Sequence, residues 1–287
     1  MGGFTQHYVN CALRAASQSG DYSSLNTAIL RLIRSHKMFK ISGLIITFNE
    51  AHNIVECLRS MKQVCDDIVV VDSCSSDNTV ELATQEGATV ISQAFLGDGP
   101  QRSVGLPHCR HDWVLNLDAD ERLEDDLVAY LKNTDLSQQN VSAIETRRRN
   151  YIGNQTTRFA GQYPDYVRRI FNKTKADFSP VAAHTKIQSH SLKQIPAHIT
   201  HYSYKDYPDI FKRACLYGTW QAQTIAKTNK IIGPLTPGFH CLFSFLKHYL
   251  IKLGFLAGHD GLAISLGKAI ASYIKYAHAI ELRRNKN

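Results

Sequence analysis

Short apolar runs alternate with helical patterns through the first half of the chain. Four runs are continuous and rich in β-branched residues, as strands buried on both faces require: residues 41–48, 67–72, 88–92 and 113–118. Helical spacing follows three of them, from about Glu50, over 78–86 and over 123–131. This alternation predicts an α/β fold on a mixed, mostly parallel sheet with right-handed crossovers and flanking helices.

The pattern changes after residue 140. Residues 141–146 and 166–171 predict two further strands, antiparallel at a sheet edge. Beyond Tyr207 the chain is helical, with breaks expected at Gly233-Pro234 and Pro237-Gly238. The chain is therefore predicted to have three parts. Residues 1–37 are either a polar extension or the result of a start codon assigned too far upstream, residues 38–205 are a sheet domain, and residues 206–287 are a C-terminal helical region.

Composition excludes several classes of protein. Of 287 residues 44% are hydrophobic and the formal net charge is +8, which does not fit a disordered or low-complexity chain. Seven cysteines, with no Cys-x-x-Cys, argue against a disulfide scaffold or zinc module and fit a reducing compartment. The positive charge predicts acidic partners such as phosphorylated ligands or anionic lipids, while no nucleic-acid module is recognisable.

No segment is typical of an export signal. Lysines interrupt the most apolar stretch, 239–257, so a membrane span is not expected, although the stretch could lie on a membrane.

Polar and acidic residues gather where three of the predicted strands end. They are Thr47, Asn49 and Glu50 after the first strand, Asp72 and Ser73 after the second, and Asp118 and Asp120 after the fourth. Because ligands of open α/β sheets bind beyond the carboxyl ends of the strands, this edge is the predicted ligand site.

Asp118 and Asp120 are candidate metal ligands. Residues i and i+2 of an extended segment point the same way, so both carboxylates can face one divalent cation. The cation would neutralise charge on a departing diphosphate. An acidic turn beside a helix start is the alternative, but the neighbouring acidic strand ends favour a functional site.

The other two strand ends predict contacts with a nucleotide. Asp72, with Ser73, can accept hydrogen bonds from a base or a ribose hydroxyl, with a turn and helix cap as the alternative. Thr47, Asn49 and Glu50 can meet the nucleotide through short polar groups and main-chain amides, with another helix cap as the alternative.

Two further residues are candidates. Arg102 ends the loop 97–102, whose glycines permit close backbone approach, and can reach a phosphate. The absence of Gly-x-Gly-x-x-Gly and Gly-Lys-Ser/Thr disfavours a dehydrogenase or a phosphate-loop NTPase. His184 could complete a metal shell or contact a pyrophosphate, although a lone histidine is more often structural.

The segments SGLIITFNEAHNI, IVVVDSCSSDNT and LNLDADERL, together with QRS, YVRRIF and GFLAGHDGL, carry a family resemblance. They resemble family-2 inverting glycosyltransferases of the GT-A fold, and more narrowly the bacterial lipopolysaccharide core glycosyltransferases that add a glucose-type sugar. The resemblance spans residues 40 to 280 and leaves 1–37 outside.

The resemblance implies a role for each matched residue. Asp72 would recognise the base, Asp118 the ribose or the metal, Asp120 the metal (Mg or Mn), and Arg102 the diphosphate. Relatives commonly read His-Glu where this chain has His184-Thr185, so a carboxylate expected near the acceptor is missing. Asp165 is predicted to replace it as the catalytic base.

The expected reaction moves a hexose, with inversion, from a nucleotide-diphosphate sugar such as a UDP-sugar to a glycolipid, in particular the lipopolysaccharide inner core. The enzyme is expected in the cytoplasm, peripheral to the inner membrane. A catalytically impaired nucleotide-sugar-binding protein is the alternative. A nucleotidyltransferase would need a Gly-rich, lysine-bearing loop after the first strand, which residues 47–50 do not provide.

Overall fold

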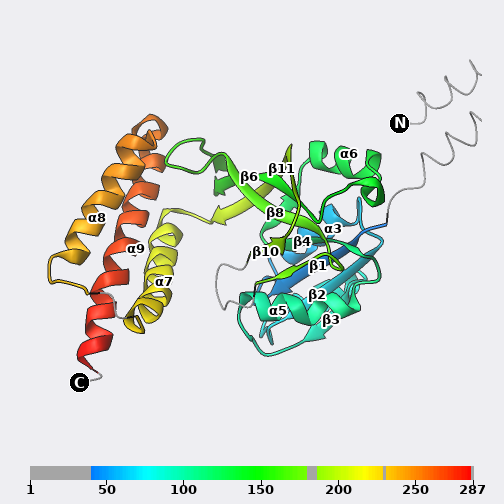
Figure 1. The fold of residues 1–287 in the computed structure, drawn as a ribbon, viewed down its shortest axis with the longest axis horizontal. Helices are drawn as coiled ribbons and strands as arrows, with labels where there is room; N and C mark the ends of the chain where they lie inside the picture. The colour runs from blue at the N-terminus through cyan, green and yellow to red at the C-terminus, as the bar shows by residue number, and fades with distance from the viewer. Residues whose placement is uncertain (1–39, 180–185, 229–230, 286–287) are drawn as a thin grey trace, which may run out of the picture.

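The computed structural model describes residues 40–179, 186–228 and 231–285, which form an α/β domain and a C-terminal group of helices (Figure 1). The predicted extension 1–37 lies outside the described residues.

Four parallel strands form one half of the sheet: β1 (Ser42–Thr47), β2 (Asp67–Asp72), β3 (Thr89–Ser92) and β4 (Trp113–Asp118). Their order is β3-β2-β1-β4, so the chain winds outward in both directions from β1 and the sheet has a topological switch point there. Thr47 pairs with Asp72 and Ile46 with Asp118, which places the three predicted strand ends side by side.

The helices of this half are α3 (Ile54–Met61), α4 (Thr79–Gln85), α5 (Asp98–Gly105) and α6 (Asp125–Asn133). The prediction that the first helix begins near Glu50 is wrong by about one turn, because residues 50–53 form a turn in which the Asn53 N–H donates to the Glu50 carbonyl (2.9 Å). The helix predicted from residue 123 begins later as well, because Leu123 ends a strand, β5 (Glu121–Leu123).

The second half of the sheet is mixed. It contains β5, β6 (Ala143–Ile152), β7 (Gln155–Thr156), β8 (Asp165–Asn172) and β11 (Leu192–Tyr204). β8 runs antiparallel to β4 and to β6, so the predicted antiparallel direction is confirmed. The prediction that β6 and β8 lie at a sheet edge is wrong, because β11 and β5 extend the sheet beyond β6, β11 parallel to β6 and antiparallel to β5. A separate hairpin, β9 (Ala176–Phe178) with β10 (Ile187–Ser189), lies beside it. The mixed α/β sheet with flanking helices confirms the predicted fold class.

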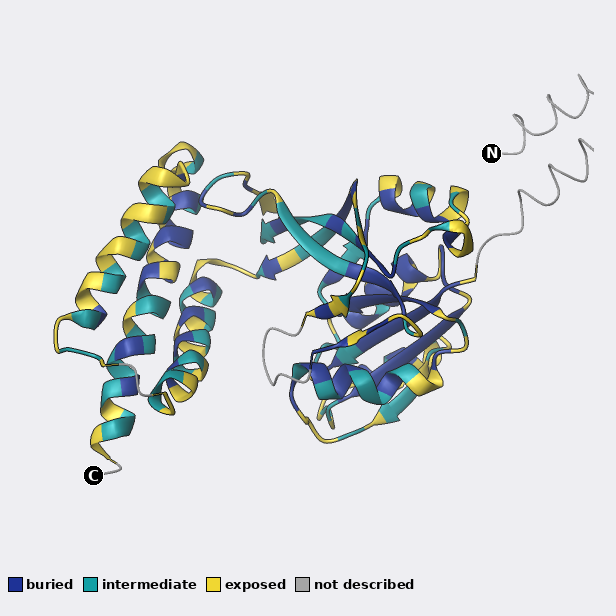
Figure 2. Cartoon of the chain, viewed as in Figure 1, coloured by how far each residue is buried: buried dark blue, intermediate teal, exposed yellow. Residues whose placement is uncertain are grey.

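Buried side chains cover both faces of the central strands, which are dark throughout Figure 2. Leu44 belongs to the same buried cluster as Phe171 on one face, while the next residue, Ile45, belongs to the cluster of Leu58 on the other. Such strands are apolar at successive positions because neither face meets water. Gly105 lets α5 approach closely, since a Cβ there would lie 2.4 Å from Leu44 Cδ1.

The C-terminal part contains α7 (Tyr207–Ala226), α8 (Thr236–Leu246), the single turns η3 (Lys247–Ile251) and η4 (Gly254–Ala257), and α9 (Gly258–Arg284). α9 lies between α7 and α8 (Figure 1). The break predicted at Pro237-Gly238 is wrong, because Pro237 occupies the first turn of α8, where its missing N–H costs nothing. Ala160 and Ile210 join Ala263 and Ile264 in the apolar contact between this part and the sheet.

Among the described residues, no single helix is long and apolar enough to cross a membrane. The pair Thr236–Ile251 and Gly254–Arg284, bent by 68°, reaches that length and composition only together.

Candidate active site

Hydrogen bonds join the loops that follow β1 and β2. Thr47 Oγ1 donates to Asp72 Oδ1 (2.9 Å), and the Ser75 main-chain N–H donates to Asp72 Oδ2 (2.7 Å). Asn49 Oδ1 accepts from the main-chain N–H of Ser76 (2.8 Å). Asp72 is fully buried, so its carboxylate organises both loops, and its contact with a base stays a prediction.

The backbone of this edge is unusual at two positions. Asn49 (φ 55°) and Cys74 (φ 62°) are both left-handed, a conformation that Asn tolerates and Cys seldom adopts. Burial raises the pKa of the neighbouring Glu50 carboxyl. Ser73 Oγ accepts a hydrogen bond from Gln101 Nε2 (3.2 Å). The left-handed backbone at Asn49 and Cys74 is strained, and strained backbone concentrates at functional sites. This agrees with a ligand at these strand ends.

Asp118 lies between two guanidinium groups. Arg102 Nη2 lies 2.5 Å from Asp118 Oδ1, and Arg169 Nη2 donates to Asp118 Oδ2. Arg102 also donates to Asn116 Oδ1 (2.8 Å). Burial alone would raise the pKa of the Asp118 carboxyl, but the positive charges of Arg169 and Arg102 hold it well below its usual range. Asp118 is therefore an ionised carboxylate whose two oxygens already have positive partners.

Glu121 completes this ion-pair network and is fully buried. Its Oε1 accepts from Arg169 Nη2 (2.5 Å) and Arg148 Nη1 (3.2 Å), and its Oε2 accepts from the main-chain N–H of Asp118 (3.1 Å). Within the described ranges, the buried Nε of Arg169 has no hydrogen-bond partner. A buried N–H of this kind marks a place where a polar partner is expected.

A cavity of about 450 Å³ lies beside the network, within the size range of small-molecule sites. Its lining includes five basic side chains, Arg102, Arg148, Arg168, Arg169 and Lys186. Three acidic side chains, Asp98, Asp118 and Glu145, oppose them. The excess of positive charge suits an anionic ligand such as a diphosphate.

Strand β11 brings a histidine to Asp120, in the turn after β4. The main-chain N–H of Tyr202 donates to the Asp120 carbonyl (3.0 Å), and His201 Nε2 lies 3.5 Å from Asp120 Oδ2. Burial alone would raise the pKa of Asp120, but the contact with His201 lowers it overall.

Asn150 lies beside His201, because the two residues are register partners on β6 and β11. Its side chain helps to fix the orientation of the His201 ring through a hydrogen bond. Its Nδ2 donates to the Gln162 carbonyl (3.0 Å) and to Asp165 Oδ2 (3.2 Å), both acceptors, which assigns the orientation of the amide. Its Oδ1 then faces His201 Nδ1 at 2.6 Å. The Ser203 hydroxyl also lies 2.8 Å from Nδ1, but it donates its hydrogen to the same Asn150 Oδ1 (2.9 Å). Since Oδ1 can only accept, Nδ1 carries a proton.

His201 Nε2 therefore faces the Asp120 carboxylate in one of two forms. It carries a hydrogen if both ring nitrogens are protonated, and a free lone pair if only Nδ1 is. Two protein ligands of one cation, each about 2.1 Å from it, lie about 3.0–3.4 Å apart. The separation of 3.5 Å between Nε2 and Oδ2 is close to that value. An outer hydrogen bond that fixes the ring is also typical of histidine ligands, so Asp120 and His201 fit a divalent cation.

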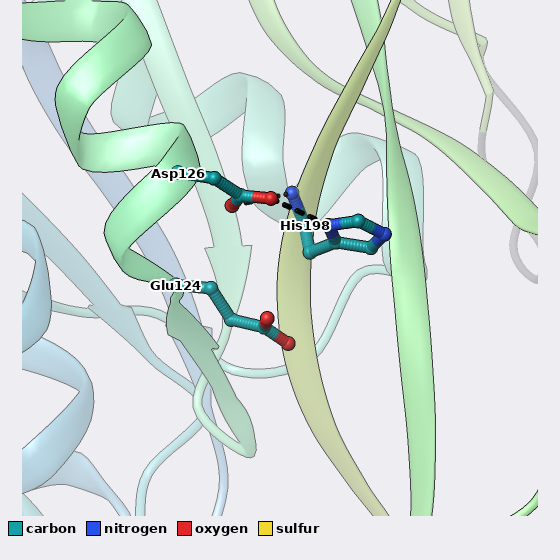
Figure 3. Close-up of side chains that lie close together, drawn as sticks. All are labelled: Glu124, Asp126 and His198. Atoms are coloured by element: carbon teal, nitrogen blue, oxygen red, sulfur yellow. Dashed lines mark hydrogen bonds and ion pairs between the residues drawn. The ribbon is translucent and has the colours of Figure 1, made fainter.

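Glu124, Asp126 and His198 form a second carboxylate–histidine group, with ligand atoms within 4.8 Å of one another (Figure 3). His198 Nδ1 lies 2.5 Å from Asp126 Oδ2, and its Nε2 lies 3.0 Å from the Tyr163 hydroxyl. Glu124 pairs with Arg149 (2.6 Å). Because both ring nitrogens and the glutamate have partners, this group fits a structural network better than a metal centre.

Asp165, the predicted base, begins β8 opposite Arg148 of β6. Arg148 Nη2 lies 2.8 Å from Asp165 Oδ2, the oxygen that also accepts from Asn150. Asp165 Oδ1 has no hydrogen bond to any described residue and is the oxygen that can take a proton. Its catalytic role stays a prediction.

The structure thus brings most of the predicted residues to one edge of the sheet. Asp118 differs from the prediction in its surroundings, since arginines rather than an open metal position face it. His184 lies outside the described residues, and its metal role stays a prediction. Five residues of the site were not predicted from the sequence: Glu121, Arg148, Asn150, Arg169 and His201. The arginine clusters at residues 147–149 and 168–169 contain two of them and are the sequence signal that points to this network.

A mixed sheet of this topology, with acidic strand ends at its switch point, has the architecture of the GT-A fold. Residues 42–194 match the family model for glycosyl transferase family 2, and the chain belongs to this family. An uncharacterized glycosyltransferase of Rickettsia prowazekii is 30% identical, over 85% of this chain and 88% of that protein.

More distant relatives share smaller parts of the chain or lower identity. The lipopolysaccharide core biosynthesis glycosyltransferase LpsC of Rhizobium meliloti is 30% identical, over 39% of this chain and 43% of that protein. The crystal structure of S. aureus TarS 1-349 is 15% identical with a TM-score of 0.41, over 87% of this chain and 92% of that one.

Proposed function

We propose that this glycosyltransferase moves a hexose, with inversion, from a UDP-sugar to a glycolipid acceptor. The observation that carries the proposal is the pairing of Asp120 with His201, two residues along the chain from Asp118, which lines a cavity rich in arginine. The cation site and the basic lining together suit a sugar bound through a diphosphate.

Asp120 and His201 would hold a divalent metal, Mg or Mn. When bound, the metal would act as a Lewis acid toward the departing diphosphate. Asp118 would not need to ligate it, because Arg102 and Arg169 already balance its charge. Arg102 lines the cavity, so its positive charge would act on the diphosphate directly. It would also act indirectly, by holding Asp118 in place.

Asp165 Oδ1 would take the proton of the acceptor hydroxyl. The hydroxyl oxygen would then attack the anomeric carbon from the face opposite the diphosphate, whose bond to that carbon breaks. The nucleoside diphosphate leaves with the bonding electron pair, and the sugar configuration inverts. General-base assistance of this kind contributes ~10²–10⁴-fold.

The acceptor is proposed to be a phosphorylated lipopolysaccharide inner core, and the place of action the cytoplasm. Similarity to LpsC over part of the chain supports the acceptor class. The described cysteines are free thiols, which agrees with a reducing compartment.

A nucleotide-sugar-binding protein without transfer activity is the second candidate. It is favoured by the engagement of Asp165 Oδ2 with Arg148 and Asn150, which leaves only one oxygen of the carboxylate free for an acceptor hydroxyl. The two functions separate in a screen of UDP-glucose, UDP-galactose and GDP-mannose for nucleotide release, with and without purified core glycolipid. Release that needs the glycolipid supports transfer, whereas donor binding without release supports the binding protein.

A further inference from the structure

Helix α8 is held to the protein by one face only. The His240 ring stacks on Tyr276 of α9 with centroids 4.2 Å apart, and Ser272 Oγ donates to the His240 carbonyl (3.3 Å). The opposite side is yellow along much of its length in Figure 2. The exposed residues there form what we name the α8 face: Leu235, Phe239, Leu242, Phe243, Leu246 and Leu250.

The α8 face is one continuous apolar stripe. Successive members are separated by four, three, one, three and four residues, which confines them to a sector about 100° wide on an α-helix. Phe239 is 74% exposed. The stripe continues into the following turns through four more exposed residues: Ile251, Leu253, Phe255 and Leu256. A contiguous patch of this kind marks a surface that meets a partner.

Charge along this region has a single sign. No Asp or Glu occurs between residues 210 and 259, whereas six Lys or Arg residues do. The exposed charged side chains between residues 236 and 257 are Lys247 and Lys252, each next in sequence to a member of the stripe or of its continuation. A partner must therefore accept large apolar side chains beside positive charge.

We propose that the α8 face rests on an anionic lipid bilayer. The apolar stripe would enter the boundary between headgroups and acyl chains, and Lys247 and Lys252 would meet the anionic headgroups. A symmetric second copy fits less well, since the same patch would face itself and bring lysine against lysine. The proposal goes beyond the proposed function, because lipid binding requires neither donor nor acceptor.

Flotation of the full chain with vesicles tests the proposal. The wild type should float with vesicles of phosphatidylcholine and phosphatidylglycerol and much less with phosphatidylcholine alone. Phe239→Gln with Phe243→Gln should lower the bound fraction at least tenfold. Lys247→Glu with Lys252→Glu should abolish the preference for anionic lipid.

Matched controls change the same chemistry elsewhere. Leu192→Gln removes another exposed apolar side chain, and Lys132→Glu with Lys175→Glu makes the same change in charge. Both controls should bind as the wild type does. Circular dichroism and light scattering of every variant check folding and oligomeric state. Equal flotation of wild type and Phe239→Gln/Phe243→Gln would overturn the proposal. A wild-type dimer that this double variant converts to monomer would overturn it in favour of a second copy.

Discussion

Arg102 Nη2 and Asp118 Oδ1 lie 2.5 Å apart, although the first residue belongs to α5 and the second ends β4. The contact gives the first aspartate of the Asp-x-Asp motif a positive partner from the protein itself. Asp120, two residues on, faces His201 instead. The two aspartates of one motif therefore have different partners, and only the second has the surroundings of a metal ligand.

Loss of the Arg102 guanidinium should destabilise the fold. Arg102→Ala removes a buried guanidinium and leaves the half-buried Asp118 with one positive partner fewer, which we expect to cost about 3 kcal/mol of unfolding free energy, the lower end for a buried pair. Arg59→Ala is the control, because Arg59 pairs with Glu56 and Glu86 on the surface and should cost less than about 1 kcal/mol. Urea unfolding measures both, and equal losses would contradict the network.

Asn150 should control metal affinity without touching the metal. Asn150→Ala removes the nearer of the two partners of His201 Nδ1 and leaves only the Ser203 hydroxyl, so we expect Mn²⁺ to bind about 10–100-fold more weakly. His201→Gln should weaken binding further. Asn133→Ala, on the exposed end of α6, is the control. Electron paramagnetic resonance of free Mn²⁺ gives each affinity, and wild-type binding by Asn150→Ala would refute the role of the amide.

Asp165→Asn tests the proposed base. Single-turnover transfer to the glycolipid should fall by ~10²–10⁴-fold, because the amide cannot take the proton. Donor affinity should stay near that of the wild type, since the donor residues lie at other strand ends. Single-turnover rates separate chemistry from product release. An unchanged rate would show that another group is the base.

Asp67 should contribute to acid sensitivity far from the site. Burial alone would raise its pKa, but hydrogen bonds from Arg110 and Ser42 lower it below the ordinary value of 3.8. A carboxyl with a lowered folded pKa stabilises the fold above its unfolded pKa, and the contribution is lost as the pH falls through the folded pKa. Asp67→Asn should cost about 1–3 kcal/mol at pH 7.

The difference between wild type and Asp67→Asn should shrink below about pH 4. Unfolding titrations from pH 7 to pH 3 measure it, and a constant difference would contradict the shift.

The parallel half of the sheet was predictable because continuous Val and Ile runs are typical of strands with two buried faces. β11 was not, since LKQIPAHITHYSY mixes proline and histidine with apolar residues. Its pairing with β6 depends on chain segments about 50 residues apart. His201 and Asn150 meet only through that pairing, so the cation site could be predicted for Asp120 and not for its partner.

Nucleotide release from a UDP-sugar in the presence of core glycolipid and Mn²⁺ tests the central claim most directly. We predict that the wild type releases nucleotide, and that release stops in excess chelator and without the glycolipid. Asp120→Asn should release none, although it should remain folded by its unfolding free energy. Release that continues in chelator, or wild-type release by Asp120→Asn, would contradict the assignment of Asp120 and His201 as the metal site of a glycosyltransferase.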